Sequence, residues 1–172
     1  MIISGYQGIG KSTLARESDK FVDLESSHFI IDEKRSDNWY IIYCRIAESL
    51  SQQGYDVFVS SHKEVRDYLS RTSKERLVLI YPAKSFKDEW IEKLKNRFFR
   101  DASTKNLRAL RGAQYYFDSN VIDLMCQPGF IKVEITSEEY SLKSILDLIR
   151  EGKFVKDQVF ETFNLKTHLM NL

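Results

Sequence analysis

A glycine-rich segment lies almost at the start of the chain, between a short apolar run and a helix-forming run. It extends from Gly5 to Ser12 and matches the pattern G-x-x-x-x-G-K-[ST] at every fixed position. The β-branched pair Ile2-Ile3 before it favours a strand, and residues 13–17 after it favour a helix. A strand, a tight loop and a helix in this order predict a βα unit, which belongs in a sheet covered by helices.

Each fixed position of this segment is suited to holding phosphate. Glycines let the backbone curl so that consecutive N–H groups point inward at an anion, and a helix starting near Lys11 adds its positive dipole end. We expect Lys11 to reach the β and γ phosphates of ATP and Ser12 to bind Mg²⁺. The predicted ATP-binding residues are Gly5, Gly8, Ile9, Gly10, Lys11, Ser12 and Thr13.

The rest of the chain alternates strand patterns with helical patterns. Further strands are expected at residues 20–25, 55–60, 76–81 (closed by Pro82) and 130–135, and further helices at about 39–53, 62–71, 86–99, 103–125 and 141–150. Parallel neighbours need crossover connections, which are usually helical. The predicted fold class is therefore α/β, with a five-stranded parallel sheet and helices on both faces.

Size and composition indicate one domain built around one sheet. The net charge of +1 gives no overall attraction to nucleic acid or membrane, so anion binding must be local. Cys44 and Cys126 lack the spacing of a metal site and are expected to be reduced. No run approaches the roughly 18 apolar residues of a membrane span, and no leader is evident, which predicts a cytoplasmic protein.

Two carboxylates close the second expected strand. Asp23 and Glu25 are two residues apart, so both would point from one face of the strand toward the glycine-rich loop. Such a pair can hold Mg²⁺ through water or accept a proton from an attacking hydroxyl group. The alternative is that they cap the next turn or pair with Lys34 or Arg35.

Seven cations surround residues 101–104, between the two helices expected over 86–125. Phosphoryl transfer depends on positioning and charge neutralisation, and arginines on a mobile segment can close over the transferring group. The preferred candidates are Arg97, Arg108 and Arg111; the other cations are interpreted as solvated helix charges.

Two further residues are candidates for substrate binding. Arg66 follows the third strand, near the edge where such sheets bind ligands, and would either grip a phosphate with two hydrogen bonds or pair with Glu64 or Asp67. Trp39 starts a helical stripe that is expected to be core, with base stacking as the alternative.

On these residues the chain resembles the nucleoside-monophosphate kinase branch of the P-loop fold, which includes adenylate-kinase-like and phage-type deoxynucleotide kinases. The resemblance covers about residues 1–150 and rests on the Gly5–Ser12 loop, the Phe21–Ser27 segment and the arginine-bearing helices from Trp90 to Arg111. It implies a three-layer P-loop NTPase domain over residues 1–172, with a lid-like segment at about 86–125 and a C-terminal tail at 151–172. The chain departs from many adenylate kinases at Ser60-Ser61, where they place Asp-Gly.

The resemblance implies an enzyme that transfers the γ-phosphoryl group of magnesium-ATP to a nucleoside or deoxynucleoside monophosphate. The candidate residues are Lys11, Asp23, Arg97, Arg108 and Arg111 for catalysis, Asp23, Glu25, Ser26, Trp39 and Arg66 for the acceptor, and Ser12 and Asp23 for Mg²⁺. Two alternatives stay open: a kinase for a hydroxyl acceptor, either a small molecule or a polynucleotide 5′ end, and a non-catalytic ATP-binding regulatory protein. The expected partners are a triphosphate donor and a small nucleotide acceptor, with neither membrane nor nucleic acid; a homodimer through the aromatic tail is a further hypothesis.

Overall fold

Five parallel strands form the centre of the protein, in the order β2-β3-β1-β4-β5. The computed structural model describes residues 1–30, 34–137 and 139–153. The strands are β1 (Ile2–Gly5), β2 (Phe21–Asp23), β3 (Asp56–Val59), β4 (Leu77–Pro82) and β5 (Ile131–Ile135). Ile3 of β1 lies opposite Phe58 of β3 on one side and Val78 of β4 on the other. Because all neighbours are parallel, the carboxyl ends of the strands meet at one edge of the sheet.

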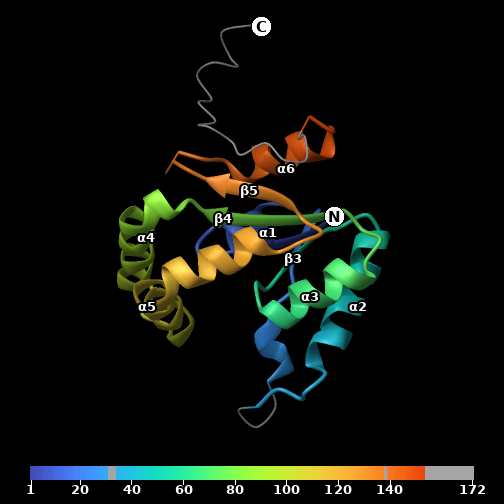
Figure 1. The fold of residues 1–172 in the computed structure, drawn as a ribbon, viewed down its shortest axis with the longest axis horizontal. Helices are drawn as coiled ribbons and strands as arrows, with labels where there is room; N and C mark the ends of the chain where they lie inside the picture. The colour runs from blue at the N-terminus through green and yellow to red at the C-terminus, as the bar shows by residue number, and fades with distance from the viewer. Residues whose placement is uncertain (31–33, 138, 154–172) are drawn as a thin grey trace, which may run out of the picture.

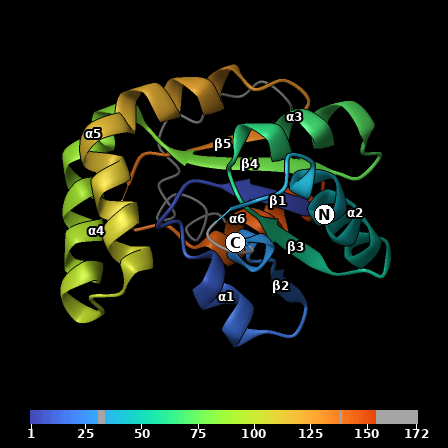
Figure 2. The same cartoon turned by 90° about the horizontal axis from the view of Figure 1, so that it is seen from below.

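Helices lie on both faces of this sheet (Figures 1 and 2). They are α1 (Lys11–Glu17), α2 (Trp39–Gln52), α3 (Lys63–Thr72), α4 (Lys87–Arg100), α5 (Thr104–Cys126) and α6 (Leu142–Arg150), with the short 3-10 helices η1 (Ser26–Phe29) and η2 (Lys84–Phe86). On one face α6 contacts α1, and on the other α2 packs against α3, with the second half of α5 beside them (Figure 2). The α4 and α5 helices form a hairpin beyond the carboxyl ends of the strands (Figure 1).

The three central strands are buried along their whole length, which explains their almost continuous apolar sequences. The helices cover them with apolar stripes, of which Trp90 and Leu94 on α4 and Phe117 and Val121 on α5 are fully buried examples. The core therefore runs from the sheet into the hairpin, and this contact fixes the hairpin beside the loop that follows β1.

The predicted α/β class and five-stranded parallel sheet are confirmed, and each expected helix is present close to its predicted limits. The second strand is shorter than predicted: it ends at Asp23, Leu24 N–H still bonds to Phe58 O at 2.9 Å, and Glu25 leads into η1. Pro82 lies inside β4 as its last residue, where its missing N–H does not interrupt the strand. The long α5 helix is kinked at Tyr116, whose φ of −131° is not helical.

No helix among the described residues is both long enough and apolar enough to cross a membrane. Most of the tail predicted at 151–172 lies outside the described residues, because the last of these is residue 153. The homodimer hypothesis based on that tail therefore stays a prediction.

Candidate nucleotide-binding site

The backbone of the loop between β1 and α1 is shaped to receive an anion. Gly8 and Gly10 have φ angles of 92° and 99°, a conformation that side-chain-bearing residues rarely adopt. Over the ranges that the structure describes, the N–H groups of residues 7–12 have no backbone acceptor, whereas Thr13 and Leu14 both donate to Gly10 O. Consecutive unpaired N–H groups in such a curl form an anion-binding nest.

The α4–α5 hairpin holds this loop in place through Gln7. The indole Nε1 of Trp90 on α4 donates to Gln7 O at 2.9 Å, and Gln7 Nε2 donates to Ala109 O on α5 at 2.7 Å. A Cβ at Gly8 would lie 3.0 Å from Leu94 Cδ2, so the loop backbone packs directly on α4. These contacts hold the base of the hairpin against the loop, so the hairpin forms one side of the site.

Lys11 bends back over the loop, where its Nζ donates to Gly5 O at 2.7 Å. Burial lowers the pKa of Lys11 to about 8, and the neighbouring cations Lys105 and Arg97 add to this effect, while Asp23 and Glu25 partly oppose it. Burial destabilises the protonated form of Lys11, and a phosphate that enters the nest stabilises it. The electrostatics of the loop therefore favour an anionic ligand.

Ser12 and Asp23 bring a hydroxyl and a carboxylate together at the mouth of the loop. Ser12 Oγ, in the first turn of α1, donates to Asp23 Oδ2 at the end of β2, and the two oxygens are 2.5 Å apart. These hard oxygen donors suit Mg²⁺. Among the described residues no group of three or more His, Cys, Asp and Glu could hold a metal alone. A Mg²⁺ ion at this pair would need further ligands, which waters and the phosphates of a bound nucleotide commonly supply.

A cleft of about 620 Å³ opens in front of this pair, between β2 and the tip of the α4–α5 hairpin. Asp23 and Glu25 line one side, and Arg97 and Lys105 line the other. Lys105 Nζ forms an ion pair with Glu25 Oε1 across the opening. Although Glu25 is not on the strand, it reaches the same cleft as Asp23 because the turn after β2 carries it there.

The remaining predicted residues divide between this cleft and other parts of the protein. Arg108 and Arg111 are exposed on α5 and do not line it, whereas Arg97 does. Trp39 is buried among Phe29, Tyr43 and His62 and does not line this cleft. Of the other predicted ATP-loop residues, Ile9 is buried and Thr13 is exposed.

Arg66 is buried inside the protein and is occupied by contacts between α3 and α5. Its guanidinium donates to Ser61 O at 3.0 Å and to Gln127 Oε1 at 2.6 Å, and it forms an ion pair with Asp123. These contacts join two helices on one face of the sheet. They indicate a structural role for Arg66 and leave its predicted phosphate contact without geometric support.

Arg66→Met should destabilise the fold by about 2–4 kcal/mol, because it removes three hydrogen bonds and leaves the buried Gln127 amide oxygen unpaired. The measurement is the urea midpoint at unchanged m-value. Arg71→Met, on the exposed end of α3, is the control and should shift the midpoint little. An Arg66→Met protein as stable as the wild type would contradict the structural role.

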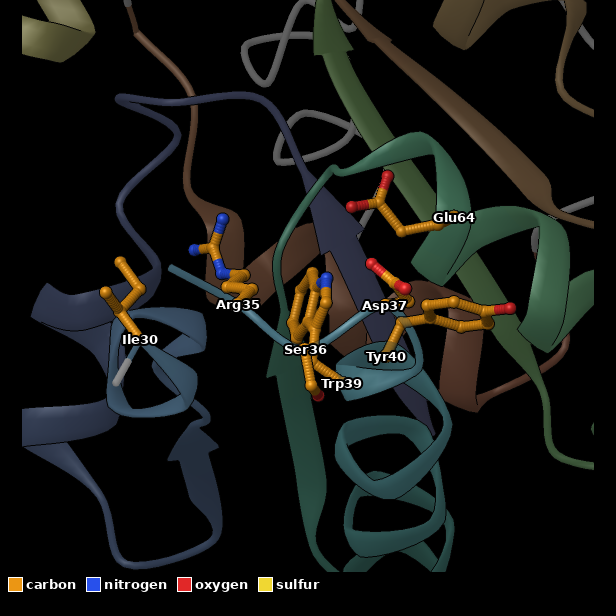
Figure 3. A pocket seen from close by; sticks show the side chains of 7 residues that line it. All are labelled: Ile30, Arg35, Ser36, Asp37, Trp39, Tyr40 and Glu64. Atoms are coloured by element: carbon orange, nitrogen blue, oxygen red, sulfur yellow. The ribbon is translucent and has the colours of Figure 1, made fainter. Parts of the chain in front are cut away.

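A second cavity, of about 490 Å³, lies beside the first, between the start of α2 and the start of α3 (Figure 3). Arg35 and Ile30 lie on one side of the Trp39 ring, and the carboxylates of Asp37 and Glu64 lie on the other. Sequence reasoning considered Arg35 only as a partner for Asp23 or Glu25. The Arg35 guanidinium stacks on the Trp39 ring at 4.6 Å. The sequence signal for this contact is the position of Arg35 four residues before Trp39.

Nucleotide affinity should change little near pH 7 and fall above about pH 8, the pKa of Lys11 in the free protein. Bound phosphate raises this pKa, so binding above pH 8 requires uptake of a proton, and affinity falls by at most about tenfold per pH unit. Phosphate groups are already ionised there, with a second pKa near 6. The measurement is calorimetric titration with a non-hydrolysable ATP analogue. Lys11→Arg should bind independently of pH between 7 and 9.5; the same fall in that variant would refute Lys11 as the source.

No protein-family model matches the sequence, and a search of curated proteins finds no match either. The function of this site is therefore inferred from its residues and their geometry.

Proposed function

We propose that the protein is a P-loop kinase that transfers the γ-phosphoryl group of magnesium-ATP to a nucleoside or deoxynucleoside monophosphate. The observation that carries this proposal is the joint position of the Ser12–Asp23 pair and Arg97 around one open cleft, with an unpaired N–H nest and Lys11 directly before Ser12 in the loop. Phosphoryl transfer needs these elements: a nest and a lysine for the donor, oxygen ligands for magnesium, and a further cation over the transferring group. The proposal includes a cytoplasmic location, where ATP is available.

The residues divide between donor and acceptor. The loop from Gly5 to Ser12 would bind the triphosphate, with Lys11 neutralising the β and γ oxygens. Mg²⁺, when bound with ATP through Ser12 and Asp23, would bridge and polarise the phosphates. Arg97 and Lys105 would contact the transferring group from the hairpin, after Lys105 releases Glu25. The acceptor would enter along β2 and η1, past Glu25 and Ser26.

The contact of Asp23 favours a phosphate acceptor over a hydroxyl acceptor. Its Oδ2 accepts the hydrogen bond of Ser12, the expected magnesium ligand, so the carboxylate is oriented toward the metal position. A phosphate acceptor is already ionised and needs no strong base. A hydroxyl acceptor would require this same carboxylate to remove a proton.

The test is ATP consumption measured with each nucleoside and deoxynucleoside monophosphate, with small hydroxyl compounds and with 5′-hydroxyl oligonucleotides. We expect one or a few monophosphates to stimulate ADP formation and to appear as diphosphates. Stimulation by a hydroxyl compound alone would show that the acceptor is a hydroxyl group and not a monophosphate. Slow ATP hydrolysis that no compound affects would favour a regulatory ATP-binding protein.

A further inference from the structure

Arg35 is held beside the nucleotide cleft by contacts from three sides. Its Nη2 lies 3.3 Å from Ser26 O and 3.2 Å from Ser26 Oγ, its Nη1 lies 3.4 Å from His62 Nε2, and its guanidinium stacks on Trp39. Ser26 directly follows Glu25, which lines the nucleotide cleft. Residues 25–26 therefore link the two cavities through the chain, because Glu25 lines the first and Ser26 contacts Arg35, which lines the second.

The guanidinium of Arg35 has N–H donors that its contacts do not use. Its contacts use at most three of the five N–H groups of arginine. Nε is buried and has no hydrogen-bond partner in the part of the chain that the structure describes. No carboxylate pairs with Arg35 among those residues either. The remaining Nη1 N–H and the positive charge of this partly buried guanidinium are available to an external anion.

The hydrogen bonds of His62 identify which ring nitrogen faces Arg35 as an acceptor. Ser60 Oγ lies 2.5 Å from Nδ1 and also accepts the backbone N–H of His62 at 3.3 Å. The Arg35 guanidinium has only donors, so Nε2 is unprotonated and accepts from it, and in the neutral ring Nδ1–H then donates to Ser60 Oγ. This arrangement requires a neutral imidazole, since an imidazolium would present a second positive charge to Arg35.

We propose that Arg35, positioned by His62 and Ser26, forms a second anion site that binds the phosphate monoester of the nucleotide acceptor. This inference rests on the proposed function for the identity of the ligand. A cavity of about 490 Å³ is within the usual range for a small-molecule site. Asp37 and Glu64, on the far side of Trp39 from Arg35, accept hydrogen bonds from hydroxyl or amino groups of the nucleoside (Figure 3).

Other charged groups face His62 from its neighbours. Glu64 and Arg66 lie on α3, which begins directly after His62, Arg35 comes from the segment before α2, and the neutral ring of Trp39 packs edge-on at 5.5 Å. Burial lowers the pKa of His62, and Arg35 lowers it further, while Glu64 raises it. The imidazole is thus neutral at pH 7. Acid pH weakens acceptor binding in two ways, because it protonates the imidazole and also the phosphate monoester, whose second pKa is near 6.

The experiment is calorimetric titration of the full chain with nucleoside 5′-monophosphates, the matching nucleosides and inorganic phosphate. The wild type should bind its preferred monophosphate about 10- to 100-fold more tightly than the nucleoside, and Arg35→Gln should lose this difference. Arg35→Gln should bind a non-hydrolysable ATP analogue as the wild type does. Arg45→Gln, an exposed arginine on α2, is the matched control and should change neither affinity.

His62→Gln tests the positioning role separately, because the glutamine oxygen still accepts from Arg35 but is not protonated. It should retain monophosphate affinity at pH 7.5 and weaken less than the wild type between pH 6.5 and 5, because only the protonation of the phosphate remains. Weakening in His62→Gln as large as in the wild type would refute the role of His62.

Equal binding of monophosphate and nucleoside, or full monophosphate affinity in Arg35→Gln, would overturn the anion site. If monophosphate binds through Arg35 but no phosphoryl group is transferred, the proposed function fails and the anion site stands. If transfer occurs and Arg35→Gln leaves the acceptor KM unchanged, the anion site fails and the proposed function stands.

Discussion

Lys11→Met should lower phosphoryl transfer by about 10³-fold or more and, at the same time, stabilise the unliganded protein. The loss of activity follows because the Lys11 ammonium is the cation expected to neutralise the β and γ phosphates, and comparable charge contacts contribute this much to transfer. The gain in stability follows from the pKa of about 8, which shows that the charged form is held at a cost below that pH. The same substitution should thus lower activity and raise stability.

The sign of the stability effect follows from the lowered pKa. An unfolded lysine titrates near 10.5, so the penalty on the folded state is fully present below pH 8 and disappears between pH 8 and 10.5. Removing the charge should raise the free energy of unfolding by about 1–3 kcal/mol at pH 7, which corresponds to about 2–4 °C in melting temperature for each kcal/mol. The difference between wild type and Lys11→Met should shrink as pH rises above 8.

Melting curves in buffer without phosphate or sulfate, together with transfer assays, measure both effects. Lys20→Met, which removes an exposed lysine before β2, is the matched control and should leave both activity and melting temperature nearly unchanged. A Lys11→Met protein that melts below the wild type would contradict the inference that the charge of Lys11 destabilises the folded protein. Retention of more than about a tenth of the activity would contradict the role of Lys11 in transfer.

The periodicity of apolar residues was sufficient to predict the sheet and the helices, because strand and helix patterns are local. The sequence also predicted the meeting of Ser12 with Asp23, since the first two strands and the loop lie close together along the chain. The extent of β2 was less predictable, because Leu24 keeps an apolar side chain and one bond to Phe58 O after the strand has ended. Glu25 therefore enters the cleft from a turn.

Arg66 and Arg35 show where local reasoning stops. Arg66 was predicted at the ligand-binding edge because it follows β3, but its ion-pair partner Asp123 is 57 residues away in sequence. Nothing near Arg66 indicates that contact. Conversely, Arg35 looked like a neighbour for nearby carboxylates, while the structure pairs it with His62, which is 27 residues away. Helix packing decides which of the two arginines faces a cavity, and local sequence patterns do not predict helix packing.

Asp23→Asn should reduce kcat by about 10²- to 10³-fold while preserving the fold. Asparagine keeps the shape of the side chain and an oxygen that can accept from Ser12 Oγ, but it removes the negative charge beside the expected magnesium position. If Asp23 positions the metal, the variant should require at least about tenfold more Mg²⁺ for half-maximal activity, since carboxylates are the main protein ligands for this ion. The affinity for nucleotide without magnesium should change little.

The magnesium titration also distinguishes metal positioning from proton abstraction. A general base lost by Asp23→Asn would lower kcat on a hydroxyl acceptor at every magnesium concentration, whereas a metal ligand lost by the same change is partly compensated by excess magnesium. Asp19→Asn, in the exposed turn before β2, is the matched control and should behave as the wild type. An unchanged magnesium requirement in Asp23→Asn would show that this carboxylate does not serve the metal, and kinetics unchanged throughout would remove Asp23 from the site altogether.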